Sequence, residues 1–167
     1  SEVDGQPIHK HAFLHVCVGF SPIPMVKSWM KRLLGPKGAY YLGTLLQVIF
    51  YRCPYMAIST EEKEHSGRVW MVIVGNAEKS AGGSMCLSPG ARIDDGKLNI
   101  TILAQNSKSK LGMVTKLLPK VATGAYVSMP GVSYFPGERI QISSDPPALL
   151  ELDGDLFGTT PATFTVC

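Results

Sequence analysis

Residues 138–166 read ERIQISSDPPALLELDGDLFGTTPATFTV, and this stretch decides the fold of the chain. It holds three short runs of apolar and β-branched residues, each bounded by proline or glycine. These runs are 138–143, 148–153 and 161–166. Short runs of this kind between turn-forming residues predict the strands of a meander. Two further strands are expected just upstream, at 125–129 and 133–135.

The first two thirds of the chain combine further strands with helices. Alternation of apolar and polar residues predicts strands over 11–19 and 98–102. Runs of β-branched and aromatic residues predict two more, over Tyr55–Thr60 and 68–75. The polar stretch 61–67 is expected to form a hairpin loop. Apolar residues at helical spacing predict helices over 25–34, 39–50 and 111–118, and Gly35-Pro36 is expected to end the first of them.

Each of the first two helices carries an apolar stripe, which predicts the face that it buries. The stripes are Val26, Trp29, Met30, Leu33 and Leu34 in the first helix, and Tyr41, Leu42, Leu45, Leu46, Ile49 and Phe50 in the second. Eight or more strands with few helices favour two packed sheets. The expected fold class is mainly β (α+β), a two-layer β-sandwich with two or three short helices.

Composition narrows the class of protein. The 167 residues are 45% hydrophobic and only 17% charged, which excludes a disordered chain and fits one domain. The net charge of +3 is too small for a dedicated nucleic-acid surface but allows weak attraction to an anionic membrane. The four cysteines form no Cys-x-x-Cys pair, so we expect small core residues in a reducing compartment. No bilayer-spanning run is present, and we expect a soluble, cytoplasmic protein.

Two of the turns carry residues that could bind a ligand. Gly82-Gly83 follows the strand that ends at Gly75-Asn76. A glycine-rich loop there could expose backbone N–H groups to a ligand, although a plain tight turn is the simpler interpretation. In Asp94-Asp95-Gly96 the paired carboxylates could hold a divalent cation together with backbone carbonyls and water. The simpler interpretation is again a hairpin turn, because Asp-Gly is a strong turn signal.

A third turn, Asp153-Gly154-Asp155, follows a buried strand and brings two carboxylates to its end. A carboxylate fixed at a strand end suits a general base, and an ordinary Asp-Gly turn is the alternative. His11 and His15 fall on one side of the first strand, which permits a metal pair; a solvent-facing side explains them more simply.

Several short motifs become more specific when they are taken in order. They are Lys31-Arg32-Leu33-Leu34-Gly35, Ala39-Tyr40, Val74-Gly75-Asn76, Gly82-Gly83-Ser84-Met85, Pro89-Gly90-Ala91, Asp94-Asp95-Gly96-Lys97-Leu98 and Asp153-Gly154-Asp155. In this order they resemble the C-terminal domain of the diacylglycerol kinase-like lipid kinases. That family includes bacterial diacylglycerol and YegS-type lipid kinases, sphingosine kinases and ceramide kinases. The resemblance covers nearly the whole chain, from about residue 11 to 166.

The resemblance implies a β-sandwich with short helices that packs against an N-terminal nucleotide-binding domain of the same protein. The family's nucleotide domain carries a Gly-Gly-Asp-Gly-Thr loop, and this sequence contains no such loop. Residues 1–167 are therefore expected to be a single substrate-side domain, with the nucleotide domain absent from the chain. ATP binding should be largely missing, and this fragment alone should be inactive.

The family's site residues can be placed on this sequence by position. The resemblance implies a structural Mg²⁺ held by the Asp95 side chain and by the main-chain oxygens of Arg92 and Lys97. Asp155 stands where the family has its catalytic glutamate, so it keeps the carboxylate but is one methylene shorter. The family's Asn and Asp in its first strand are absent, because residues 15–21 read His-Val-Cys-Val-Gly-Phe-Ser.

The preferred hypothesis is the lipid-substrate half of an ATP-dependent lipid kinase, with Asp155 deprotonating a lipid hydroxyl and Mg²⁺ offsetting phosphate charge. One alternative is a non-catalytic lipid-binding or regulatory module that has lost kinase chemistry. Another is the C-terminal domain of an NAD kinase-type enzyme. The cationic helix with Trp29 and Met30 could rest on the inner face of the membrane, or could pack on the sandwich like an ordinary helix.

Overall fold

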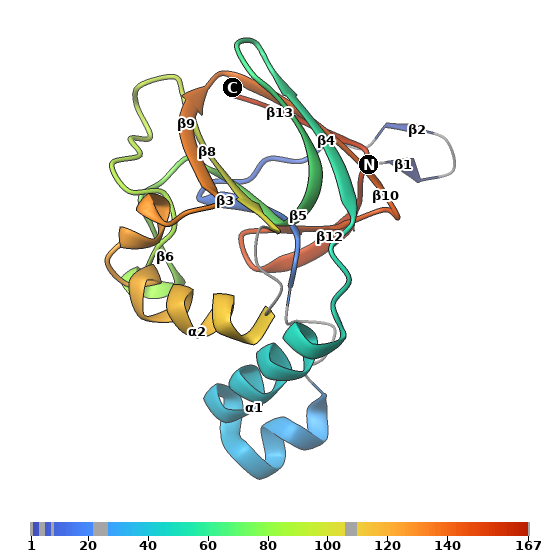
Figure 1. Ribbon diagram of the computed structural model, residues 1–167, viewed down its shortest axis with the longest axis vertical. Coiled ribbons are helices and arrows are strands. Elements are labelled where there is room, and N and C mark those ends of the chain that lie inside the picture. The colour runs from blue at the N-terminus through green and yellow to red at the C-terminus, as the bar shows by residue number, and fades with distance from the viewer. Residues whose placement is uncertain (1, 4–5, 8, 22–26, 106–109, 167) are drawn as a thin grey trace.

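The computed structural model of the chain describes residues 2–3, 6–7, 9–21, 27–105 and 110–166 (Figure 1). Within these residues, two α-helices and two short 3₁₀ helices accompany the strands. The helices are α1 (Ser28–Phe50), η2 (Ala81–Gly83), α2 (Lys110–Val121) and η3 (Ala125–Ser128). The strands are β1 (Glu2–Val3), β2 (Gln6–Pro7), β3 (His15–Gly19), β4 (Tyr55–Thr60), β5 (Glu64–Gly75), β6 (Lys79–Ser80), β7 (Met85–Cys86), β8 (Leu98–Ala104), β9 (Val132–Gly137), β10 (Arg139–Asp145), β11 (Leu149–Leu152), β12 (Asp155–Thr159) and β13 (Ala162–Thr165).

The long strand β5 belongs to both layers of the sandwich. Its first half pairs with β4, from Ser59 opposite Glu64 to Tyr55 opposite Arg68. Its second half pairs with β3 on one side and β8 on the other. One layer is thus β5-β4-β10-β13, and the other is β12-β11-β3-β5-β8-β9. All pairs are antiparallel, and the sheet curls round so that its two parts face each other (Figure 1).

The main core fills the space between the two layers. It takes alternate residues of each strand, as the period of two requires. Its buried members are Val16, Val18, Met56, Ile58, Val69, Val72, Val74, Leu98, Ile100, Ile102, Ile140, Ile142, Ala148 and Leu150. The predicted fold class, a mainly β (α+β) two-layer sandwich, is therefore confirmed.

A second core lies on the opposite face of the six-stranded layer, under the helices. Trp70, Ile73 and Leu103 project from β5 and β8 into it, where they meet Val48 of α1 and Tyr126 of η3. Because the second half of β5 is covered on both faces, its sequence is continuously apolar rather than alternating. The helices thus make a third layer beside the sandwich.

The predicted break in the first helical region is confirmed, whereas the predicted buried faces are wrong for most of their residues. Met30 of the first predicted stripe is buried as expected. Gly35 has φ 68° and ψ 171°, which divides α1 into two helical pieces. Met30, Ala39 and Val48 are buried. The members of the predicted stripes that are instead exposed are Trp29, Leu33, Leu34, Leu45, Ile49 and Phe50. Leu42 and Leu46 are half-buried, while Val26 and the Tyr41 side chain lie outside what the structure describes.

The reason for this error is the choice of contact face. The second piece of α1 turns Ala39, Gln47 and Val48 inward, and small residues such as Ala39 let a helix approach its neighbour closely. The larger apolar side chains were assumed to be the buried ones. In the part of the chain that the structure describes, no helix combines the length and apolar character needed to cross a bilayer.

Other differences from the predicted elements are local. Residues 125–129 were expected to be a strand, but η3 forms there because Gly124 enters it at φ 74° and Tyr126 packs into the second core. The expected hairpin loop 61–67 is shorter, since β5 already begins at Glu64. Strand β12 was not predicted at all, because its Gly158 and Thr159 look like loop residues.

Candidate active site

Several chemistry-bearing turns meet at one end of the six-stranded layer. Strands β3, β8 and β12 all run in the same direction, because each is separated from the next by one antiparallel strand. The starts of these three strands therefore lie at the same end of the layer as the finishes of β5 and β11. The turns after Gly75, before Leu98 and before Asp155 share this end.

Asp153-Gly154 forms the two-residue turn between β11 and β12. Leu152 pairs with Asp155 across the hairpin, and both turn residues have positive φ, 49° at Asp153 and 100° at Gly154. Two consecutive positive φ angles define a type I′ turn, the geometry that suits the twist of a tight hairpin. The Asp-Gly turn predicted from the sequence is confirmed here.

The Asp153 carboxylate ties this turn to the segment that precedes β3. Its Oδ2 accepts a hydrogen bond from the Phe13 N–H at 2.7 Å, and its Oδ1 accepts from the N–H groups of Leu14 and His15 at 3.0 Å each. The Asp153 N–H in turn donates to the His15 carbonyl at 3.1 Å. Partial desolvation would raise the pKa of Asp153, but the three N–H donors and the nearby His15 outweigh it and lower that pKa. Asp153 is an anchor for the turn, a role that the sequence analysis did not assign.

Asp155, the residue predicted to be the catalytic base, is the first residue of β12 and is exposed. Its backbone is fixed by pairing with Leu152 and by the anchored turn just before it. The structure therefore presents a solvent-accessible carboxylate on a rigid strand end. Such a group can accept a proton from an incoming hydroxyl.

The neighbouring residues His15, Cys17 and Ser21, on β3 and just after it, are buried. Ser21 donates its hydroxyl proton to Glu151 Oε2 at 2.7 Å. Burial, with help from the Glu151 charge, raises the pKa of the Cys17 thiol well above its usual range, so Cys17 is an inert core residue. Burial lowers the pKa of His15, and the carboxylates of Asp153 and Glu151 oppose that shift only in part.

The suggested histidine metal pair is not supported. His15 is 8% exposed, so the solvent-facing interpretation is wrong for it, whereas His11 is exposed. Among the residues that the structure describes, no three His, Cys, Asp or Glu side chains come close enough to hold a metal ion.

The predicted cation loop precedes β8 and is exposed throughout 92–97. The Arg92 guanidinium donates two hydrogen bonds of 3.1 Å to the Asp94 carboxylate and so lowers the pKa of Asp94. Asp95 Oδ1 accepts from the Lys97 N–H at 2.9 Å, which closes a turn within the loop. A carboxylate has capacity for more than this one bond. Because Mg²⁺ keeps several waters and needs only one or two carboxylates, this donor set fits a Mg²⁺ ion at Asp95.

The base of this loop is firmly held. The Tyr126 hydroxyl donates to the Leu87 carbonyl, and the Tyr134 hydroxyl donates to the Pro89 carbonyl at 2.7 Å. Glu78 Oε1 accepts from the Gly90 N–H at 3.3 Å. The loop therefore has a defined start, a role for Tyr126 and Tyr134 that their sequence positions did not signal.

The two candidate sites share an end of the sheet but are not one site. From β12 to β8 there are four strand-to-strand steps, which at about 4.8 Å each separate the start of β12 from the start of β8 by roughly 19 Å. A cation at Asp95 would thus shape its own loop and could not touch a group that reacts at Asp155.

Gly75, at the start of the glycine-rich segment, has a packing role. A Cβ on Gly75 would lie 1.8 Å from Ser88 Oγ, so only glycine allows β5 to end against that buried serine. Gly82 and Gly83 have positive φ and open space around them, as expected of a plain exposed turn.

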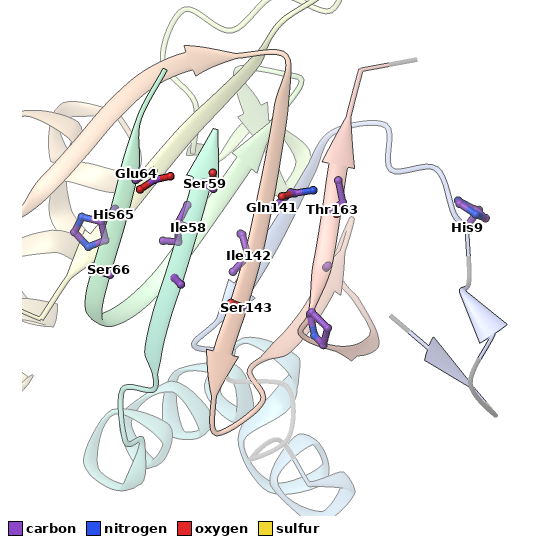
Figure 2. A pocket seen from close by; sticks show the side chains of 13 residues that line it. His9, Ile58, Ser59, Glu64, His65, Ser66, Gln141, Ile142, Ser143 and Thr163 are labelled. Carbon is purple, nitrogen blue, oxygen red and sulfur yellow. The ribbon is translucent and has the colours of Figure 1, made fainter. Parts of the chain in front are cut away.

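A hollow of the surface lies elsewhere, on the outer face of β5-β4-β10-β13 (Figure 2). It has a volume of about 950 Å³, and small polar side chains such as Ser59, Ser66, Ser143 and Thr163 line much of it. None of the predicted site residues borders it. The hollow and the candidate chemistry therefore occupy different parts of the domain.

Nearly the whole chain matches a known family. The family model for the YegS C-terminal NAD kinase beta sandwich-like domain aligns with residues 3–167. The chain belongs to this family. The match confirms the resemblance to the C-terminal domain of the diacylglycerol kinase-like lipid kinases.

Curated relatives and solved structures agree with this placement. The diacylglycerol kinases of Staphylococcus haemolyticus and Staphylococcus aureus are each 27% identical to the chain over 137 residues, which is 82% of this chain. A diacylglycerol kinase structure from Bacillus anthracis superposes with a TM-score of 0.63 at 21% identity and covers 96% of the chain. A second structure from that organism gives a TM-score of 0.68 at 20% identity and covers 98%. The chain spans only 40% and 42% of the two curated relatives and 49% and 51% of the two solved chains.

Proposed function

We propose that this chain is the lipid-substrate half of an ATP-dependent lipid kinase that phosphorylates a hydroxyl of a diacylglycerol-like or sphingoid lipid. Asp155 would take the proton from the lipid hydroxyl as its oxygen attacks the γ-phosphorus of ATP. The bond from that phosphorus to the bridging oxygen of ADP would break in the same step. ATP would be bound mainly by an N-terminal nucleotide-binding domain of the same protein.

The observation that supports this proposal most strongly is the fixed backbone position of the exposed Asp155. An exposed carboxylate stands directly after a turn that is anchored by the three N–H groups of Phe13, Leu14 and His15, just before and at the start of β3. Phosphoryl transfer depends chiefly on positioning, and a misplacement of about 1 Å can cost roughly a hundredfold in rate. A rigid strand end is well suited to that requirement. The diacylglycerol kinase names of the relatives support the lipid class of the acceptor.

The proposed Mg²⁺ at Asp95, completed by the main-chain oxygens of Arg92 and Lys97, would be structural. Bound there, the ion would offset carboxylate charge and hold the 92–97 loop in one shape. A cytoplasmic location at the inner face of the membrane would give the domain access to its lipid, and nucleic acid is not among the proposed partners.

A non-catalytic lipid-binding or regulatory module is the second candidate. It is favoured by the shorter Asp155 side chain and by the absence of the family's Asn and Asp from the first strand region, residues 15–21. Ser21 is buried and is hydrogen-bonded to Glu151 in this structure. This candidate requires that the carboxylate at position 155 has no effect on lipid phosphorylation.

The test uses the full protein, which joins this chain to its nucleotide-binding domain, with diacylglycerol and sphingosine as acceptors. Asp155→Asn keeps the size of the side chain but cannot accept the proton, so the rate should fall about 10²- to 10⁴-fold. Asp155→Glu restores the family's side chain and should keep or raise the rate.

Melting temperatures of both variants should match the original protein, because Asp155 is exposed. Asp145→Asn is the matched control, since Asp145 is an exposed carboxylate at the end of β10. Equal activity of the Asp155→Asn variant and the original would remove Asp155 from the reaction. If neither the unchanged full protein nor its Asp155→Glu variant phosphorylates a lipid, the non-catalytic module would be favoured.

A further inference from the structure

The backbone forms a bend at Phe13 and Leu14, just before β3 begins. Backbone N–H and C=O groups that lie outside the pairing of a sheet need other partners. The N–H groups of residues 13–15 donate to the Asp153 carboxylate, and the His15 carbonyl accepts from the Asp153 N–H. The carbonyls of Phe13 and Leu14 are bonded by residues that follow β5. The bend is therefore held from two sides, by the β11–β12 turn and by the end of β5.

Asn76, the residue directly after β5, provides the side chain on the β5 side of this bend. Its Nδ2 donates to the Phe13 carbonyl at 3.2 Å, and its backbone N–H donates to the Leu14 carbonyl at 2.8 Å. The Ala77 N–H donates to the same Leu14 carbonyl at 3.1 Å. The backbone bonds do not depend on the type of side chain at position 76. The bond to the Phe13 carbonyl does, because only the Asn76 amide supplies it.

The end of β5 is a firm support for that amide. Gly75 pairs with His15 of β3 on one side and with Asn99 of β8 on the other. A Cβ on Gly75 would lie 1.8 Å from the Oγ of the fully buried Ser88, so the strand ends in tight contact with its neighbours. The Asn76 side chain thus starts from a backbone that has little room to move.

We infer that Asn76 is a positioning residue for Asp155. Asp153 by itself ties the β11–β12 turn only to the bend, and the Asn76 amide ties the bend to the end of β5. The connection runs through a single residue, because Phe13 gives its N–H to Asp153 and its carbonyl accepts from Asn76. The inference rests on the proposed function, in which the position of the Asp155 carboxylate sets the rate.

The test measures kcat and KM of the full protein, with its nucleotide-binding domain and with diacylglycerol as the acceptor. A displacement of about 1 Å can cost roughly a hundredfold in rate, and a bend that only loosens should cost less. We expect Asn76→Ala to lower kcat about fivefold. Asn76→Asp keeps the shape but turns a carboxylate oxygen toward the Phe13 carbonyl, so kcat should fall about twentyfold. The KM values for ATP and lipid should not change, because the inferred role of Asn76 involves no contact with either substrate.

The control is Thr60→Ala. Thr60 is half-buried like Asn76, and its hydroxyl also donates to a backbone carbonyl, that of Lys63 at 3.0 Å. This bond closes the hairpin between β4 and β5 and has no connection to the bend. Thr60→Ala should keep the original kcat, even if its melting temperature falls as much as that of Asn76→Ala.

A double variant tests whether Asn76 acts through Asp155. Once Asp155→Asn has removed the proton acceptor, the position of that side chain no longer matters to the rate. Asn76→Ala should then cause no further loss of kcat, whereas two independent sites would show the same fivefold loss in both backgrounds.

Hydrogen exchange of backbone amides, followed by mass spectrometry of the full protein, needs no turnover. In Asn76→Ala the peptides that cover residues 13–15 and 153–156 should exchange about fivefold faster, because the bend opens more often. In Thr60→Ala these peptides should exchange as in the original protein. Unchanged exchange in Asn76→Ala would overturn the inference even if no acceptor is phosphorylated.

Four kinetic results would also overturn it. They are an unchanged kcat in both Asn76 variants, an equal loss in Thr60→Ala, a raised KM at unchanged kcat, and a full fivefold loss on top of Asp155→Asn. A full rate in Asp155→Asn would overturn the proposed function and this inference together. A rate that falls in Asp155→Asn but not in the Asn76 variants would overturn this inference alone.

Discussion

The two Asp-Gly turns at the end of the six-stranded layer look alike in sequence but are built differently. In Asp153-Gly154-Asp155, the first carboxylate accepts N–H groups from residues more than 130 positions away, and the second is left exposed. In Asp94-Asp95-Gly96, both carboxylates bond within the loop, to Arg92 and to the Lys97 N–H. The first turn is part of the tertiary structure, whereas the second is a local surface loop.

This difference indicates that a carboxylate contributes more to stability when its hydrogen-bond partners are distant in sequence than when they lie in its own loop. Exposed ion pairs such as Arg92–Asp94 contribute little, because water screens them and two side chains must be ordered. Three N–H donors from another segment cannot be replaced so easily, since that segment would have to find other acceptors. Stability should therefore depend on Asp153 and not on Asp94, and variants of the two turns can contradict this.

The largest effect on stability is expected for Asp153→Ala. It removes the acceptor of three N–H groups and places alanine at φ 49°, a left-handed conformation that costs roughly 1–2 kcal/mol. Water can reach the exposed Phe13 and Leu14 amides, so we expect a total loss of about 3 kcal/mol in the free energy of unfolding. Urea denaturation of the chain would measure it.

Asp153→Asn is the control for that experiment. Asparagine tolerates the left-handed conformation and keeps one acceptor oxygen, so it should lose only about 1 kcal/mol. Asp94→Ala in the other turn should leave the denaturation midpoint unchanged. If Asp153→Ala and Asp94→Ala proved equally stable, the contrast between the two turns would be wrong.

A second prediction concerns pH. The pKa of His15 is lowered in the folded protein, so the unfolded chain binds its proton first, and stability should begin to fall as the pH drops below about 6.5. The pKa of Asp153 is also lowered, so its contribution should be present at neutral pH and should be lost as the pH falls below about 3.9.

Urea midpoints between pH 7 and pH 3 would resolve these two steps. His15→Asn should flatten the curve in the upper range and leave the acid range unchanged. Asp153→Asn should do the opposite. A curve with the same slope in all three proteins would show that neither group is linked to folding as the structure indicates.

The same contrast explains how much the sequence could predict. Strand β4 was predicted with its observed bounds, and the Gly35 break and the Asp-Gly hairpin at 153–154 were correct, because each depends on residues near in sequence. The anchoring of Asp153 was not predicted, since its partners lie at the other end of the chain. No local pattern reports which strand will be its neighbour.

The buried faces of the two predicted helices were mostly wrong for a related reason. Periodicity shows that an apolar stripe exists, but what it packs on is decided by the tertiary structure. Ala39, Val48 and Met30 are buried, and the large apolar residues Trp29, Leu33 and Leu34 are left exposed. The placement of Asp155 and Asp95 came from family resemblance, and their roles stay predictions that activity and metal binding have to test.

The smallest effect expected at the two turns is a Mg²⁺-dependent rise in melting temperature through Asp95. If Mg²⁺ binds at Asp95, the chain should melt about 3–5 °C higher at ten times the dissociation constant, because the ion binds only the folded loop. Asp95→Ala should abolish the rise, and Ca²⁺ at the same concentration is a second ion to compare. Differential scanning calorimetry would measure it.

Asp94→Ala is the matched control, since Asp94 is the adjacent carboxylate but is already held by Arg92. Freed from Asp94, the Arg92 guanidinium would add local positive charge, so this variant could bind Mg²⁺ more weakly but should still show the rise at saturating Mg²⁺. A rise that persists in Asp95→Ala would place the ion elsewhere. A rise lost only in Asp94→Ala would mean that the ion displaces Arg92 and binds Asp94. The carboxylate on which the loop depends would then be Asp94 and not Asp95.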